Sequence, residues 1–110
     1  MPYAIDYREA AARYERVGED LCRQAAVLAE WRVEAQLGSG PAAAPVNERL
    51  IRAAADLNWA GHEMARLATE CRWRAGVCDG YRRAVWAWWA TPELARPGYP
   101  AQPYSWVSRV

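Results

Sequence analysis

The most regular pattern in the chain is an apolar repeat that predicts one long helix over residues 46–91. One register contains Leu50, Leu57, Met64, Cys71, Cys78 and Val85, and its companion contains Val46, Ala53, Ala60, Leu67, Arg74, Tyr81 and Trp88. Apolar residues at both positions of a seven-residue repeat, sustained over about six repeats without an internal proline, are typical of a coiled-coil seam. A single helix of about 65–70 Å is not stable alone in water, so this seam needs a partner.

A second, softer repeat predicts a helix over residues 6–37. Its registers are Tyr7, Tyr14, Leu21, Leu28 and Ala35, and Tyr3, Ala10, Val17, Gln24 and Trp31. Asp6 and Glu9 have the spacing of a capping box, so we expect Asp6 to cap the first turn. Gly38 follows the pattern directly, where a left-handed residue commonly ends a helix.

A linker over residues 38–45 joins the two predicted helices. Asn47 is the expected N-cap of the second helix, and Val46 and Ile51 have the spacing of a hydrophobic staple. Two heptad helices joined by about eight residues favour an antiparallel hairpin, in which the numbers of facing residues sum to about 83 or 84. The predicted fold class is therefore all-α, a two-helix hairpin that would complete a four-helix bundle by association.

This register leaves the end of the second helix without a partner. The first helix covers the second as far as about Cys78, or about Tyr81 if Tyr3 also packs. The remaining segment, residues 82–91, which we call the overhang, carries Val85, Trp86, Trp88 and Trp89. Something outside the hairpin must cover these side chains.

The last segment, residues 92–110, differs from the hairpin of residues 1–91. Thr91 and Pro92 open at most one turn of helix, and the later prolines exclude a continuous helix. The aromatic residues Tyr99, Tyr104 and Trp106 make the segment too apolar for a typical disordered tail. We expect this proline-aromatic tail to fold back over the overhang or to dock onto a second subunit.

Composition narrows the functional classes. The chain has 110 residues, enough for one domain, and a formal net charge of +1, so no global field attracts nucleic acid or an acidic membrane. All 14 basic residues are arginine, which suggests the GC-rich genome of an actinobacterium or its phage. The sequence leads us to expect neither a signal peptide nor a membrane span, and an odd count of three cysteines favours reduced thiols. The protein is thus expected to be made in the cytoplasm, with export by a signal-peptide-independent route left open.

No catalytic or metal-binding constellation emerges. His62 and Cys22 face each other in the predicted register, but two ligands do not complete a zinc site, and Cys71 lies more than two turns further along. Nothing suggests a pocket or an orienting third group for a nucleophilic cysteine. We therefore expect no enzyme activity, metal, cofactor or small-molecule substrate.

The arginines near the overhang fit a protein partner better than a nucleic acid. They interleave with aromatic residues that could stack on bases, but acidic residues lie close by, and no helix-turn-helix spacing is present. Arginine is favoured at protein interfaces, where it pairs with acids of a partner. The predicted partner-binding residues are Trp73, Tyr81, Arg82, Val85, Trp86, Trp88, Trp89, Tyr99, Tyr104 and Trp106.

Trp59-Ala60-Gly61 forms a Trp-x-Gly tripeptide. With its length, its two heptad helices and its composition, the chain resembles the Trp-x-Gly helical-hairpin proteins exported by type VII secretion systems. Proteins of that family pair as four-helix bundles, so the resemblance implies a secretion substrate or partner. In the family the tripeptide forms the turn, whereas Trp59 here lies within the second predicted helix. The family's export signal, a tyrosine followed four positions later by Asp or Glu, is absent after that helix, which implies that a partner chain carries it.

The leading hypothesis is a non-enzymatic helical module for protein–protein interaction. Its partner would be a second copy, a related helical hairpin or an effector, and the resemblance points to a type VII secretion partner or a targeting chaperone. The alternative is a structural or adaptor component of a phage or cell-envelope assembly, with the proline-aromatic tail as its docking element. Nucleic-acid binding ranks third.

Overall fold

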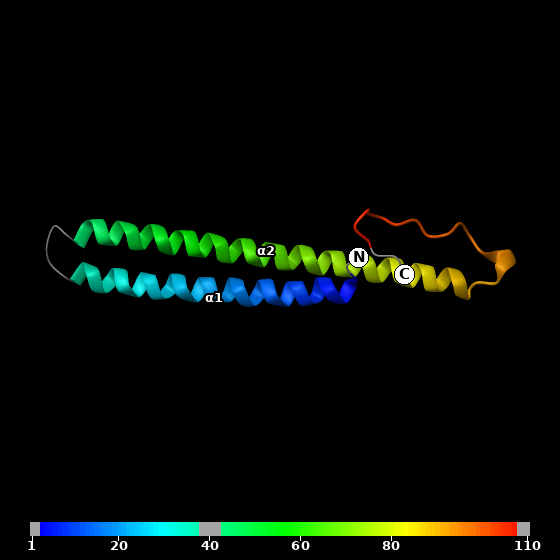
Figure 1. Cartoon of the computed structure of the whole chain (residues 1–110), viewed down its shortest axis with the longest axis horizontal. Coiled ribbons are helices and arrows are strands. Elements are labelled where there is room, and N and C mark those ends of the chain that lie inside the picture. Colours follow the sequence, from blue (N-terminus) through cyan, green and yellow to red (C-terminus); the bar gives the residue numbers. More distant parts are fainter. Residues whose placement is uncertain (1–2, 38–42, 108–110) are drawn as a thin grey trace. The chain divides into compact units, whose positions relative to one another are not determined.

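The computed structural model confirms an all-α hairpin of two long antiparallel helices (Figure 1). It describes residues 3–37 and 43–107, and the side chains among them apart from those of residues 32–37 and 43. Helix α1 spans Ala4–Leu37, helix α2 spans Ala43–Ala90, and a short 3-10 helix, η1, spans Glu93–Ala95. The described part of the chain contains no strand.

The contacts divide the chain into two compact units. The first unit contains Met1–Ala12 together with Ala68–Val110, and the second contains Arg13–Leu67. Each unit therefore includes a segment of α1 and the segment of α2 that packs against it. The tail belongs to the first unit.

Helix α1 begins two residues earlier than predicted, because its cap is different. The carbonyl of Tyr3 accepts the first helical hydrogen bond, from the backbone N–H of Tyr7 at 3.2 Å. The Asp6 carboxylate reaches back and accepts a hydrogen bond from the backbone N–H of Tyr3 at 2.7 Å. Asp6 thus lies in the first turn, where a negative charge also stabilises the helix dipole, and the prediction that it is the N-cap is wrong.

Helix α2 also begins earlier than predicted, at Ala43. Asn47 therefore lies inside the helix and is not its N-cap. Pro45 is compatible with this start, because the N–H groups of the first helical turn have no intrahelical partner, and proline lacks only that group. The helix ends at Ala90, where the hydroxyl of Thr91 donates to the carbonyl of Ala87 at 2.8 Å. Of the predicted linker, residues 43–45 are helical, and residues 38–42 lie outside the described residues.

The interior of the hairpin is built from small residues. In each helix these residues directly follow the positions of one predicted heptad register, the one that starts at Tyr3 in α1 and at Val46 in α2. The buried residues of this small-residue seam are Ala4, Ala11, Gly18 and Ala25 on α1 and Gly61, Ala68 and Ala75 on α2. On both helices they recur every seventh residue. Such residues let two helix axes approach more closely than leucine or tryptophan would allow.

One of the two sets of heptad positions predicted for the seam of α1 is consequently wrong. Val17, Gln24 and Trp31 were expected to face the second helix, yet all three are exposed. One residue turns a helix by about 100°, so the close approach at Gly18 and Ala25 directs their neighbours outward. On α2 the predicted residues Cys78 and Val85 are buried.

A close backbone contact in the second unit joins Gly18 and Gly61. A Cβ placed on Gly18 would lie 2.9 Å from the carbonyl oxygen of Gly61, and a Cβ on Gly61 would lie 2.6 Å from the Cys22 sulfur. A Cβ on Gly18 would also approach Ala65. The numbers 18 and 65, like 22 and 61, sum to 83, which confirms the predicted register.

The first unit has a small core of its own. Ala4, Ala75, Cys78 and Val107 are buried together. Val107 comes from the tail, so the tail completes this core. An ion pair between Arg8 and Asp79 joins α1 to α2 at its edge.

The Gly18 contact predicts opposite effects of alanine at two glycines. Gly18→Ala should lower the free energy of unfolding by about 1–2 kcal/mol, because separating the backbones outweighs the helix propensity of about 1 kcal/mol that alanine adds. Gly76→Ala is the matched control, because a Cβ there meets nothing within 4 Å, and it should stabilise the protein by about 1 kcal/mol. Urea unfolding followed by circular dichroism measures both, and equal stabilisation would contradict the close packing.

Candidate protein-binding surfaces

The structure sorts the predicted partner-binding residues into three groups. Six of them take part in contacts between the tail and the helices of the first unit: Trp73, Tyr81, Trp88, Tyr99, Tyr104 and Trp106. Val85 is buried, whereas Arg82, Trp86 and Trp89 are exposed. The structure therefore divides the predicted residues into inner contacts and outer surface, a distinction that the sequence prediction did not make, and their role in binding a partner stays a prediction.

Two stacked rings hold the far end of the tail. The rings of Tyr104 and Trp106 lie 5.2 Å apart and are nearly parallel, and both contact Trp73 of α2, with centroid distances of 5.3 and 5.8 Å. Trp106 also meets the edge of Tyr7 on α1 at 5.8 Å. Aromatic pairs of this kind contribute about 0.5–1.5 kcal/mol each beyond their buried area. Next to them, the Val107 side chain is 0% exposed.

The near end of the tail is fixed to the C-terminus of α2. The indole N–H of Trp88 donates to the carbonyl of Pro97 at 2.7 Å, and its ring lies 5.0 Å from that of Tyr99. Arg96 donates to the carbonyl of Thr91 at 3.0 Å, while its guanidinium lies 4.7 Å from the Trp88 ring centroid. The arginine thus satisfies a carbonyl just past the end of α2 and provides the positive charge that a helix C-terminus favours.

A second arginine binds the tail from α2. The guanidinium of Arg74 lies 4.9 Å from the Trp106 ring centroid and pairs with Glu70 at 3.1 Å. Hydrogen bonding to Tyr7 raises the pKa of Arg74. Desolvation lowers this pKa, and the negative charge of Glu70 raises it. Arg74 interrupts the predicted heptad seam, and its contacts explain why a cation is placed there.

The tail was expected to cover the overhang or to dock onto a second subunit. It folds back within its own unit, as Figure 1 shows for the orange and red segment beside the yellow end of α2. It contacts Trp88 and, through Arg96, the ring and carbonyl of Trp89, yet Trp86 and Trp89 remain 65% and 58% exposed. Leu94 in η1, which the sequence analysis did not single out, is fully exposed in the same unit.

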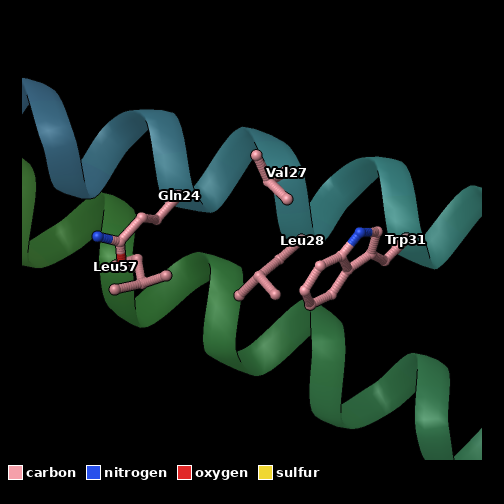
Figure 2. Close-up of a pocket in the computed structure, with 5 residues that line it drawn as sticks. All are labelled: Gln24, Val27, Leu28, Trp31 and Leu57. Carbon is pink, nitrogen blue, oxygen red and sulfur yellow. The ribbon is translucent and has the colours of Figure 1, made fainter.

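The second unit carries an apolar groove between its two helices. Figure 2 shows its lining, with Gln24, Val27, Leu28 and Trp31 on α1 and Leu57 on α2. Its volume is about 230 Å³, room for one large side chain rather than a whole helix. All of these residues except Val27 were predicted to fill the seam. The seven-residue spacing of Gly18 and Ala25 indicates that the small residues form the seam, and it could have predicted that the groove residues lie at the edge of the seam.

A second, more polar pocket lies around the glycine contact. Its volume is about 280 Å³, and its lining includes Cys22 and His62 with the carboxylates of Glu15 and Glu19. The expected proximity of Cys22 and His62 is thus confirmed. Among the described side chains, no group of three or more His, Cys, Asp or Glu residues is arranged to hold a metal ion.

Within the described ranges, no helix is both long and apolar enough to span a membrane. No protein-family model matches the chain, and no curated protein or solved structure shows significant similarity to it.

The buried end of the tail predicts a change in thiol reactivity. Val107→Asp places a charge in the core of the first unit, so the tail should detach and the alkylation rate of Cys78 should rise at least about tenfold. Peptide mass spectrometry after brief exposure to N-ethylmaleimide measures each cysteine separately. Leu94→Asp, at a fully exposed tail position, is the control and should leave the rate unchanged; an unchanged rate in Val107→Asp as well would refute the packing of the tail on Cys78.

Proposed function

We propose that the chain is a non-enzymatic helical module that binds another protein through the outer surfaces of its helices. One observation carries the proposal: the large apolar side chains lie outside and the small ones inside. Five of the seven tryptophans are more than half exposed, namely Trp31, Trp59, Trp73, Trp86 and Trp89. The largest fully buried side chain among the described residues is a valine, Val107.

This arrangement is opposite to that of a self-sufficient domain. Tryptophan is usually well buried, and contiguous exposed apolar surface on a small protein commonly marks an interaction site. Tryptophan and arginine are also the residues most enriched where protein partners bind tightly. The small-residue seam holds the helices together without these side chains. Their exposed surfaces are therefore available to a partner, although Trp73 and Trp89 also contact the tail.

The Trp-x-Gly resemblance extends the proposal to a biological setting. Trp59 lies inside α2 and is 68% exposed, so its indole is available for intermolecular contact. We propose that the chain pairs with a related helical hairpin as a type VII secretion partner, or accompanies an effector as a targeting chaperone. The adaptor alternative has less support, because the aromatic rings of the tail contact the helices of their own unit.

The proposal predicts that outer and inner tryptophans differ in what they contribute. Trp59→Ala should change the free energy of unfolding by less than about 0.5 kcal/mol, because it removes few contacts within the chain. Trp106→Ala should cost about 2–3 kcal/mol, since it removes ring contacts and the partner of Arg74. Urea unfolding measures both, and a large loss in Trp59→Ala would mean that the outer tryptophans serve the fold.

Accessibility of the tryptophans tests the proposal itself. In dilute solution acrylamide should quench most of the fluorescence, and protection should appear only as the protein associates. Light scattering on the same samples reports the mass. A folded monomer with protected tryptophans would overturn the proposed function.

The secretion setting has its own test. Co-expression with a Trp-x-Gly hairpin protein encoded by a neighbouring gene, one that carries the tyrosine-based export signal, should yield a stable 1:1 complex. Trp59→Ala should weaken that complex at least about tenfold, the effect typical of a central interface tryptophan. A partner that co-purifies equally well with both versions would count against a role for the tripeptide.

A further inference from the structure

The apolar groove of the second unit has room for a two-ring group. Its volume is about 230 Å³, whereas an apolar cavity of about 150 Å³ already accommodates benzene. The side chains of Val27, Leu28 and Leu57 line the groove together with the ring of Trp31 (Figure 2). A single six-membered ring or a leucine side chain would leave part of this space empty. The groove therefore suits a larger apolar group.

Gln24 adds one hydrogen-bond acceptor to this apolar lining. Its side-chain N–H donates to the carboxylate of Asp20 at 3.0 Å, which fixes the orientation of the amide. Figure 2 shows the Gln24 oxygen on the side that faces Leu57 and the nitrogen turned away from it. Among the residues that the structure describes, none donates a hydrogen bond to this oxygen. A ligand that fills the groove should therefore carry a donor.

We infer that the groove binds the indole side chain of a tryptophan from a partner protein. Indole is a flat two-ring group, and its single N–H is a donor without an acceptor on the same side chain. It therefore matches both the volume of the groove and the open oxygen of Gln24. Leucine and phenylalanine side chains carry no donor, and the hydroxyl of tyrosine is borne by a single ring.

The open side of the groove favours a side chain over a free small molecule. Val27 and Trp31 are 44% and 54% exposed, so a bound indole keeps one edge toward solvent. A partner's backbone can be attached at that edge, whereas a free molecule is usually buried over most of its surface. Tryptophan is also among the residues that contribute most to protein interfaces. This inference rests on the proposed function and names one anchoring side chain of the partner and the groove that receives it.

N-acetyl-tryptophanamide is a suitable probe, because it presents the same side chain without the rest of a partner. Added to the full isotope-labelled chain, it should shift the NMR signals of the Gln24 side-chain amide and the Leu57 backbone amide. The dissociation constant should be about 1 mM, the strength of one partly covered side chain. The analogue methylated on the indole nitrogen has no N–H and should bind about threefold to tenfold more weakly. N-acetyl-leucinamide should bind at least about tenfold more weakly than the probe.

Three variants of the full chain locate the site. Gln24→Leu removes the acceptor, so it should abolish the difference between the probe and its methylated analogue. Val27→Asp places a charge in the groove wall and should weaken binding of the probe at least about tenfold. Ile51→Asp is the matched control, because Ile51 lies in the same unit, is 46% exposed and does not line the groove. It should leave binding unchanged, and circular dichroism establishes that all three variants keep their helices.

Absence of shifts at Gln24 and Leu57 up to about 10 mM probe, or equal binding of N-acetyl-leucinamide, would overturn the inference. Free indole that binds at least about tenfold more tightly than the probe would make the groove a small-molecule site and overturn it as well. So would self-association of the chain that Val27→Asp abolishes, since the groove would then be an interface between copies. Each of these results leaves the proposed function standing, because acrylamide quenching and light scattering test that function separately.

Discussion

The contact between Gly18 and Gly61 imposes the constraint on which the hairpin depends. Where two helix backbones come this close, the interface accepts only glycine, alanine and other small side chains. Small side chains bury little apolar area, at about 0.8 kcal/mol for each methylene-sized group. The seam therefore provides close packing but a modest hydrophobic gain. The large apolar side chains of the chain have no place in it and lie on the outside.

The first unit adds the packing of large apolar side chains that the seam lacks. Its tail brings aromatic rings and Val107 against the helices, and two arginines, Arg74 and Arg96, lie over tryptophan rings at the two ends of this contact. Both arginines also bond to carboxylate or carbonyl oxygens, so their charges are compensated where they lie against apolar rings. The tail is consequently part of this unit's core rather than an appendage to it.

The sequence was sufficient for the two helices and for their antiparallel pairing, but not for the rotation of each helix about its axis. Heptad counting found the hairpin because apolar spacing is a property of each helix alone. It assigned Val17 and Trp31 to the seam because apolar character was weighed above size, whereas backbone approach at Gly18 decided the rotation. In the same way, the sequence showed that residues 86–89 are aromatic, but it did not show which of these rings contacts the tail. That choice depends on the turn after α2, where Arg96 binds the carbonyl of Thr91.

A seam that repeats a small residue every seven positions is nearly periodic, so two such helices could slide by one repeat at little cost in packing. On α2 the repeat of small residues ends at Arg82, and this limits sliding of the helices in one direction. A slide that brought Arg82 level with α1 would force a guanidinium into a space sized for a methyl group and remove its water of hydration. Because an arginine, Arg82, follows Ala75 at the next seven-residue position, sliding in this direction is unfavourable. This limits how much of α2 can lie alongside α1.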